Sequence, residues 1–159
     1  IVYNPKDQSP VLALKAVSET AANLSVDLIL REATTTDEVK SAFMNIPEEA
    51  NAIFLLPDSV ANTGIADTYK MAIELKLPTS GQNVNTMNDG ALTAYGVDLT
   101  VAARKQAARL AGQILEGAKP ADLPVETAQF FSAINLKTAQ AIGLDIPDAT
   151  LRQANIIVR

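Results

Sequence analysis

The sequence has neither cysteine nor histidine among its 159 residues. Without cysteine it can form no disulfide bond and no thiolate metal site, and it has no cysteine nucleophile. Without histidine it lacks the general base of a Ser-His-Asp triad and the commonest ligand of catalytic zinc. We therefore expect no metal site and no catalytic residues of the common kinds.

Long apolar runs and a basic patch are also missing. No apolar run approaches the length that spans a membrane. The formal charge is −5 and the basic residues are scattered, whereas nucleic-acid binding draws its affinity from clustered Lys and Arg. Only Arg104, Lys105 and Arg109 cluster, and helical spacing places them on the solvated outer face of one helix. We therefore expect no nucleic-acid partner.

Strand-like and helix-like segments alternate over the first 96 residues. Five segments read as strands: "IVYN" (1–4), "SVDLILR" (25–31), "NAIFLL" (51–56), "LPT" (77–79) and "GALTAYG" (90–96). Helical patterns separate the first four, with Ser9, Thr35 and either Asn62 or Thr63 as predicted N-caps. The first of these helices should bury Leu14, Val17, Ala21 and Leu24. This alternation predicts an α/β fold with three layers and a doubly wound, mostly parallel sheet.

The pattern changes after Gly96. Residues 98–118 form the longest predicted helix, whose inner face carries the small and apolar residues Ala103, Ala107, Leu110, Ala111 and Ile114. Residues 119–159 then supply a proline-punctuated linker, a return strand and short C-terminal helical turns. We expect residues 1–159 to form a single α/β domain. The chain opens on Ile1 rather than Met, which suggests a processed or truncated product.

Short polar side chains follow three of the predicted strands. Ligands of open α/β sheets bind outside the carboxyl ends of the strands. That rule selects the loops "NPKDQS", "PDSVAN" and "SGQN", together with the end of the fifth strand. The candidate residues at this edge are Asn4, Asp7, Ser9, Asp58, Ser59, Asn62, Ser80, Gln82 and Tyr95.

The chemistry at this edge suits an amino acid. A helix N-terminus attracts a carboxylate, and Asp58 would attract an ammonium group. Tyr3 or Tyr95 could pack against the side chain of such a ligand. Helix capping is the simpler explanation of most of these polar residues. Asp58 and Ser59 are harder to explain as caps because they precede the expected cap by several residues.

Enzymatic interpretations find less support. A dinucleotide-binding fold needs G-x-G-x-x-G after the first strand, where this sequence has "NPKDQSP". No P-loop lysine motif is present, and Asp7 with Asp58 only partly imitates the acidic cluster of a phosphoacceptor domain. An α/β enzyme with an unrecognised carboxylate site stays open as a less favoured alternative.

Several motifs resemble one known family. "IVYNP", "FLLPDS", "GALTAYGVDL", "ILEGAKPADLPVE" and above all "INLKTAQAIGLDIP" are similar to the ABC-transporter substrate-binding proteins of the tryptophan- and tyrosine-binding type. The resemblance runs over nearly the whole chain. It implies the carboxyl-terminal lobe of a type I periplasmic-binding-protein fold, in which two lobes close on the ligand.

The resemblance also implies a function. The protein would capture a small amino-acid-like ligand outside the cytoplasm, as a periplasmic protein or a membrane-anchored lipoprotein, and deliver it to an ABC permease with its ATPase. It would not be an enzyme and would need no cofactor. Cleft-facing positions of the family carry over to Asp58, Ser59, Ser80, Gly81 and Tyr95. A ligand-sensing domain of a signalling protein with the same fold is the alternative.

The chain departs from the resemblance in length, because family members have two lobes and this sequence starts where the second begins. In the family arrangement the helix at 98–118 would cross to the absent first lobe. Its apolar face would then lack a partner, and an exposed stripe of this kind usually finds another surface. We therefore predict a homodimer through the helix at 99–117.

Overall fold

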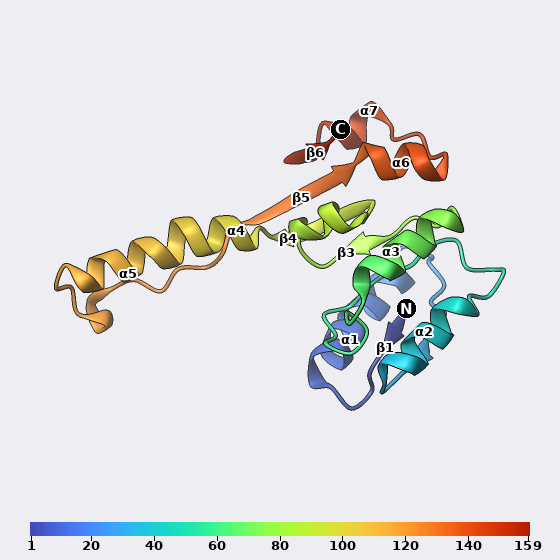
Figure 1. Cartoon of the computed structure of the whole chain (residues 1–159), viewed down its shortest axis with the longest axis horizontal. Coiled ribbons are helices and arrows are strands. Elements are labelled where there is room, and N and C mark those ends of the chain that lie inside the picture. Colours follow the sequence, from blue (N-terminus) through green and yellow to red (C-terminus); the bar gives the residue numbers. More distant parts are fainter.

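The computed structural model describes all residues, 1–159, and shows a body from which one helical arm projects (Figure 1). The body comprises residues 1–98 and 130–159. The arm comprises residues 99–129, which run outward as a helix and return as an irregular segment. Both termini belong to the body.

Strand pairing in the body is mostly parallel, as predicted, but the strands form two sheets, of two and four strands. β1 (Val2–Tyr3) pairs in parallel with β2 (Arg31–Glu32). On the other side, β3 (Ser80–Gly81) pairs in parallel with β4 (Thr93–Val97), and β5 (Phe130–Asn135) pairs in parallel with β6 (Ile156–Val158). Only β4 and β5 are antiparallel, and they are the two strands that lead into and out of the arm.

The predicted central strand at 51–56 is shorter than expected. Only Ile53 forms a β-bridge, to Thr79. Past that point the backbone N–H of Leu55 donates to the side chain of Ser80 at 3.0 Å instead of to a backbone carbonyl. The regular ladder therefore ends after one residue, although Ile53, Leu55 and Leu56 are all buried as a central strand requires.

Helices cover both faces of the sheet. In Figure 1, α1 and α2 lie on either side of β1. The observed bounds are α1 Gln8–Asn23, α2 Thr36–Met44, α3 Ile65–Glu74, the 3-10 helix η1 Val84–Asp89, α6 Leu136–Ile142 and α7 Asp148–Leu151.

The helix caps agree only in part with the sequence. Thr35 and Glu38 form the predicted capping box of α2. The N-cap of α1 is Asp7 rather than Ser9, since the Asp7 carboxylate accepts the Ser9 N–H at 2.9 Å. The N-cap of α3 is Gly64 rather than Asn62 or Thr63, at a left-handed φ of 76° that favours glycine.

The main core lies between the sheet and the helices α2, α3 and η1. Its members include Val39, Phe43, Tyr69, Met87 and Ile53. The face covered by α1 is much less filled. Of the four residues predicted to form the buried stripe of α1, only Ala21 is buried, and Leu24 is exposed. The prediction therefore holds only for Ala21, while Leu14 and Val17 are half-buried.

The arm helix starts and ends close to the predicted residues. It runs through α4 (Leu99–Val101), the π-helical segment η2 (Ala102–Ala107) and α5 (Ala108–Leu115), with Asp98 as N-cap. The returning segment includes a 3-10 turn, η3 (Pro120–Asp122). None of the three helical segments contains a buried residue. None of the helices in the chain is both apolar enough and long enough to cross a bilayer.

Candidate functional site

The three polar loops selected by the strand-end rule meet at one edge of the sheet. Asn4, after β1, donates its backbone N–H to Asp58, which follows the Ile53 segment, at 2.6 Å. Ser59 donates to Asp7 at 3.5 Å. Gln82, after β3, donates to Asn62 at 2.6 Å. We call Asn4, Asp7, Asp58, Ser59, Asn62 and Gln82 the strand-end cluster.

Asp58 holds these loops together. Its side chain is buried, with a relative exposure of 1%, and three backbone N–H groups donate to it. One carboxylate oxygen accepts from Asn4, and the other accepts from Val60 and Ala61, both at 2.9 Å. Buried charge is tolerated when hydrogen bonds satisfy it in this way. The carboxylate thus has a structural task beside the ammonium-binding role predicted for it.

Asn4 and Ser59 lie nearer to solvent. Ser59 is exposed, and its hydroxyl makes only the long contact with Asp7. The Asn4 side chain is half-buried and accepts the Lys6 N–H at 3.0 Å. Its amide N–H₂ group makes no bond within the chain. These polar groups are suited to hydrogen-bonding a ligand.

Gln82 connects two of the loops through its side-chain amide. The strand-end rule placed it at this edge, but neither capping nor the resemblance selected it for binding. Its amide donates both to the Leu56 carbonyl and to Asn62, and so bridges the second and third loops. The sequence signal that places Gln82 at this edge is its position directly after β3.

Ser80, Gly81 and Tyr95 belong to a second feature. They line a hollow of about 390 Å³ over β3, β4 and β5, which α7 borders through Thr150. Tyr95 is 72% exposed, and its ring lies 5.6 Å from that of Phe130 across the β4–β5 pair. The structure therefore groups the six predicted site residues in two neighbouring sets: Asn4, Asp58 and Ser59 in the cluster, and Ser80, Gly81 and Tyr95 in the hollow.

Tyr69 supports the hollow from beneath. Its hydroxyl donates to the Ser80 carbonyl at 3.3 Å, and its side chain is fully buried. Burial raises the pKa of Tyr69 to about 12, so the hydroxyl stays protonated and remains a donor at neutral pH. Ser80 is thus held by Leu55 on one side and by Tyr69 on the other.

The site offers hydrogen-bond donors, acceptors and exposed aromatic rings. No group of three or more Asp and Glu side chains lies close enough together to hold a metal ion. The arrangement is suited to binding a small polar molecule with an apolar part.

The family model for ABC transporter substrate binding proteins matches residues 1–158. The chain belongs to the ABC transporter substrate-binding protein family. No curated protein matches the chain at a significant level. Proteins of this family bind small molecules outside the cytoplasm for ABC transporters and are normally not catalytic.

Solved structures show the same fold. A conserved domain protein from Vibrio cholerae O1 biovar El Tor superposes with a TM-score of 0.78 at 28% identity, over 98% of this chain and 53% of that one. An ABC domain from Streptococcus pneumoniae in complex with L-Trp superposes with a TM-score of 0.77 at 24% identity, over 99% of this chain and 53% of that one.

A third structure agrees. It is the ligand-free, open form of a substrate-binding protein with adhesive properties from Clostridium difficile, with a TM-score of 0.68 at 20% identity, over 99% of this chain and 52% of that one. The chain therefore spans about half the length of each of these structures. Its α/β body corresponds to one lobe of a periplasmic-binding-protein fold.

Proposed function

We propose that this chain is the carboxyl-terminal lobe of an extracytoplasmic solute-binding protein that captures an amino-acid-like ligand by closure of two lobes. The observation that supports this most strongly is the strand-end cluster, in which three loops far apart in the sequence are hydrogen-bonded together at the carboxyl edge of the sheet. Ligands of open α/β sheets bind at this edge.

The chemistry of the proposed ligand follows from the two sets of site residues. Asn4 and Ser59 offer polar groups to the ammonium and carboxylate ends. Tyr95 and its partner Phe130 present exposed rings to an apolar or aromatic side chain. A relative of this fold holds L-Trp, which makes L-tryptophan the first ligand to test.

The proposed partners follow from the family. The loaded protein would dock on an ABC permease with its ATPase, either from the periplasm or from a lipid anchor. The arm (residues 99–129) would reach toward the first lobe. Where that lobe is absent, the chain would form a homodimer through the helix at 99–117.

The ligand can be tested with unusual clarity because the chain contains no tryptophan. The emission of L-tryptophan, titrated with the purified chain, reports binding without background from the protein. We expect a saturable change in emission. Tyr95→Ala should weaken binding about 5- to 10-fold, the worth of one aromatic contact. Tyr3→Ala is the matched control, since Tyr3 bonds to Glu32 on β2 and does not line the hollow. An unchanged emission at saturating protein would contradict the proposed ligand.

A further inference from the structure

We infer that Asn85 is a positioning residue that ties the turn at 80–83, on the ligand side of the body, to the start of the arm. The inference rests on the proposed function, because this turn contains Ser80, Gly81 and Gln82 of the two sets of site residues. Through this tie, the direction in which the arm leaves the body depends on the position of the turn.

Asn85 makes the hydrogen bonds that join the body to the start of the arm helix. It lies in η1, and its side-chain oxygen accepts the Leu99 N–H at 2.9 Å while its amide donates to the Thr100 hydroxyl at 3.3 Å. The first N–H groups of a helix have no partner within the helix. The N-cap Asp98 accepts those of Thr100 and Val101, so η1 supplies the acceptor for the one that the cap leaves out.

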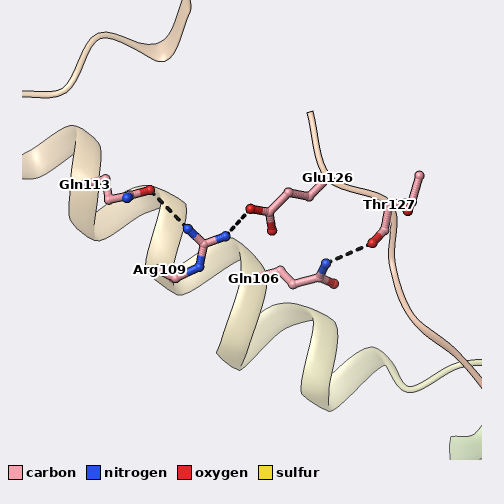
Figure 2. A network of polar contacts seen from close by, with 5 residues as sticks. All are labelled: Gln106, Arg109, Gln113, Glu126 and Thr127. Carbon is pink, nitrogen blue, oxygen red and sulfur yellow. Dashed lines mark hydrogen bonds and ion pairs between the residues drawn. The ribbon is translucent and has the colours of Figure 1, made fainter. Parts of the chain in front are cut away.

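Apart from the bonds with its own N-cap, the arm has no other hydrogen bond to the body. Its helix and its returning segment brace each other instead. Arg109 pairs with Glu126 and bonds to Gln113, and Gln106 donates to the Thr127 carbonyl at 3.0 Å (Figure 2). Because all of these residues belong to the arm, they stiffen it without fixing its direction. That direction is set where the arm begins, at the bonds to η1 and at the β4–β5 pair (Figure 1).

The helix η1 is held equally firmly to the ligand side. Asn83, which directly follows Gln82, caps η1 with its side chain by accepting the Asn85 N–H at 3.0 Å. The Asn83 carbonyl accepts the Thr86 hydroxyl at 2.6 Å. At Gly81 a Cβ would overlap that same hydroxyl, so η1 packs directly on the end of β3. A displacement of the turn therefore moves η1, and with it the acceptor for the arm helix.

A second contact connects the turn with the start of the arm. Gly96 lies in β4, two residues before the N-cap Asp98, and a Cβ at Gly96 would overlap the Gln82 carbonyl. The backbones of β4 and of the turn are therefore in direct contact just before the arm begins. Beyond this point the arm helix becomes π-helical over η2, and π-helical turns are frequent at functional sites.

Distances between spin labels test whether Asn85 sets the direction of the arm. The chain has no cysteine, so pairs of introduced cysteines can be labelled selectively. Leu115→Cys at the end of the arm helix with Leu144→Cys in the body reports the direction of the arm, and Met44→Cys with Leu144→Cys reports the body alone. All three side chains are exposed. Double electron–electron resonance is measured without ligand, on labelled chain diluted into unlabelled chain, so that only distances within one molecule contribute.

Three variants separate the hydrogen bonds of Asn85 from its bulk. Asn85→Leu removes both bonds at similar size, so it should shift and broaden the arm–body distances and speed exchange of the Leu99 amide about 5- to 10-fold. Asn85→Asp keeps an acceptor at the positive end of the helix and should restore most of the parent distribution. Asn88→Leu is the matched control and should change nothing, because Asn88 lies in the same 3-10 helix, is exposed and makes no side-chain hydrogen bond.

Unchanged arm–body distances in Asn85→Leu, or an equal change in the pair within the body, would overturn the inference. Thr100→Val is the second variant if Asn85→Leu does not fold, because Thr100 is exposed and loses only its hydroxyl bond to Asn85. It should also broaden the arm–body distances, and an unchanged distribution would overturn the inference in the same way.

L-Tryptophan tests the link between the arm and the turn. It should narrow the arm–body distances of the parent chain and leave those of Asn85→Leu unchanged, because coupling between two sites acts in both directions. Saturation with L-tryptophan without any change in the parent distances would overturn this link. An L-tryptophan emission that the chain never changes would contradict the proposed ligand, whereas the ligand-free distances still decide the role of Asn85.

Discussion

The backbone N–H of Asn4 donates to the carboxylate of Asp58 at 2.6 Å, across 54 residues of sequence. This bond joins the loop after β1 to the loop after the Ile53 segment. The backbone N–H groups of Val60 and Ala61 donate to the other oxygen of the same carboxylate. One buried side chain therefore links the two loops at the carboxyl ends of the strands.

Replacement of Asp58 by alanine should lower the free energy of unfolding by about 3 to 5 kcal/mol, because it leaves three backbone donors without an acceptor. Ser59→Ala is the matched control and should change it by less than about 0.5 kcal/mol, since Ser59 is exposed and makes one long contact. Urea denaturation measures both. Equal stabilities of the two variants would show that Asp58 does not anchor the loops.

Two glycine-to-alanine substitutions should have opposite effects. A methyl group on Gly96, in β4, would overlap the Gln82 carbonyl, and backbone cannot easily move aside. We expect Gly96→Ala to cost about 1 to 3 kcal/mol of stability. Gly112 lies within α5 with nothing near its Cβ position, so Gly112→Ala should add about 0.5 to 1 kcal/mol. The melting temperatures of the two variants and the parent chain measure these effects. If Gly112→Ala also lowers the melting temperature, the space around the Gly112 Cβ position is not open as described.

Tyr69 should make stability fall at high pH. Its pKa is about 12 in the folded chain, raised by burial from an ordinary value of 10.0. Between these values the unfolded chain loses the proton while the folded chain keeps it, so stability decreases as pH rises. The loss should reach about 2 kcal/mol by pH 12. In the Tyr69→Phe variant the urea midpoint of unfolding should fall less between pH 10 and pH 12 than in the parent chain. An equal fall in both chains would show that Tyr69 is not its source.

The capping box of α2 should contribute to stability at neutral pH and less in acid. Thr35→Ala removes the acceptor for the Glu38 N–H and should cost about 0.5 to 2 kcal/mol. Hydrogen bonds from the Thr34 backbone and hydroxyl lower the pKa of Glu38. Its stabilising effect is therefore present above the ordinary carboxyl pKa and is lost as pH falls through the lowered value. Glu38→Gln should lower the urea midpoint more at pH 7 than at pH 3.

The sequence predicted best those structural features that depend on residues close together in the chain. The order of strands and helices, the capping box at Thr35 and the long helix that starts after Asp98 are all local features, and the structure shows them. The strand predicted at 25–31 is much shorter, because β2 covers only Arg31–Glu32. The family resemblance is also confirmed. The gathering of the strand-end loops followed from a general property of parallel sheets rather than from any single motif.

Features that depend on distant partners could not be predicted. The tie between Asp58 and Asn4 joins residues that no local pattern relates. The apolar side of α1 has the periodicity of a buried helix, yet only the presence of a neighbour decides whether Leu24 is covered. Asp7 and Ser9 are both good caps, and the backbone conformation decided between them.

The central claim is that the strand-end cluster and its adjoining hollow bind an amino-acid-like ligand. The most direct measurement is amide chemical-shift mapping of the isotopically labelled chain during titration with L-tryptophan. We predict saturable shifts at Asn4, Ser59, Ser80, Gly81 and Tyr95 with a dissociation constant of about 1 mM or tighter. Shifts confined to other parts of the chain, or none at saturating ligand, would contradict the proposed site.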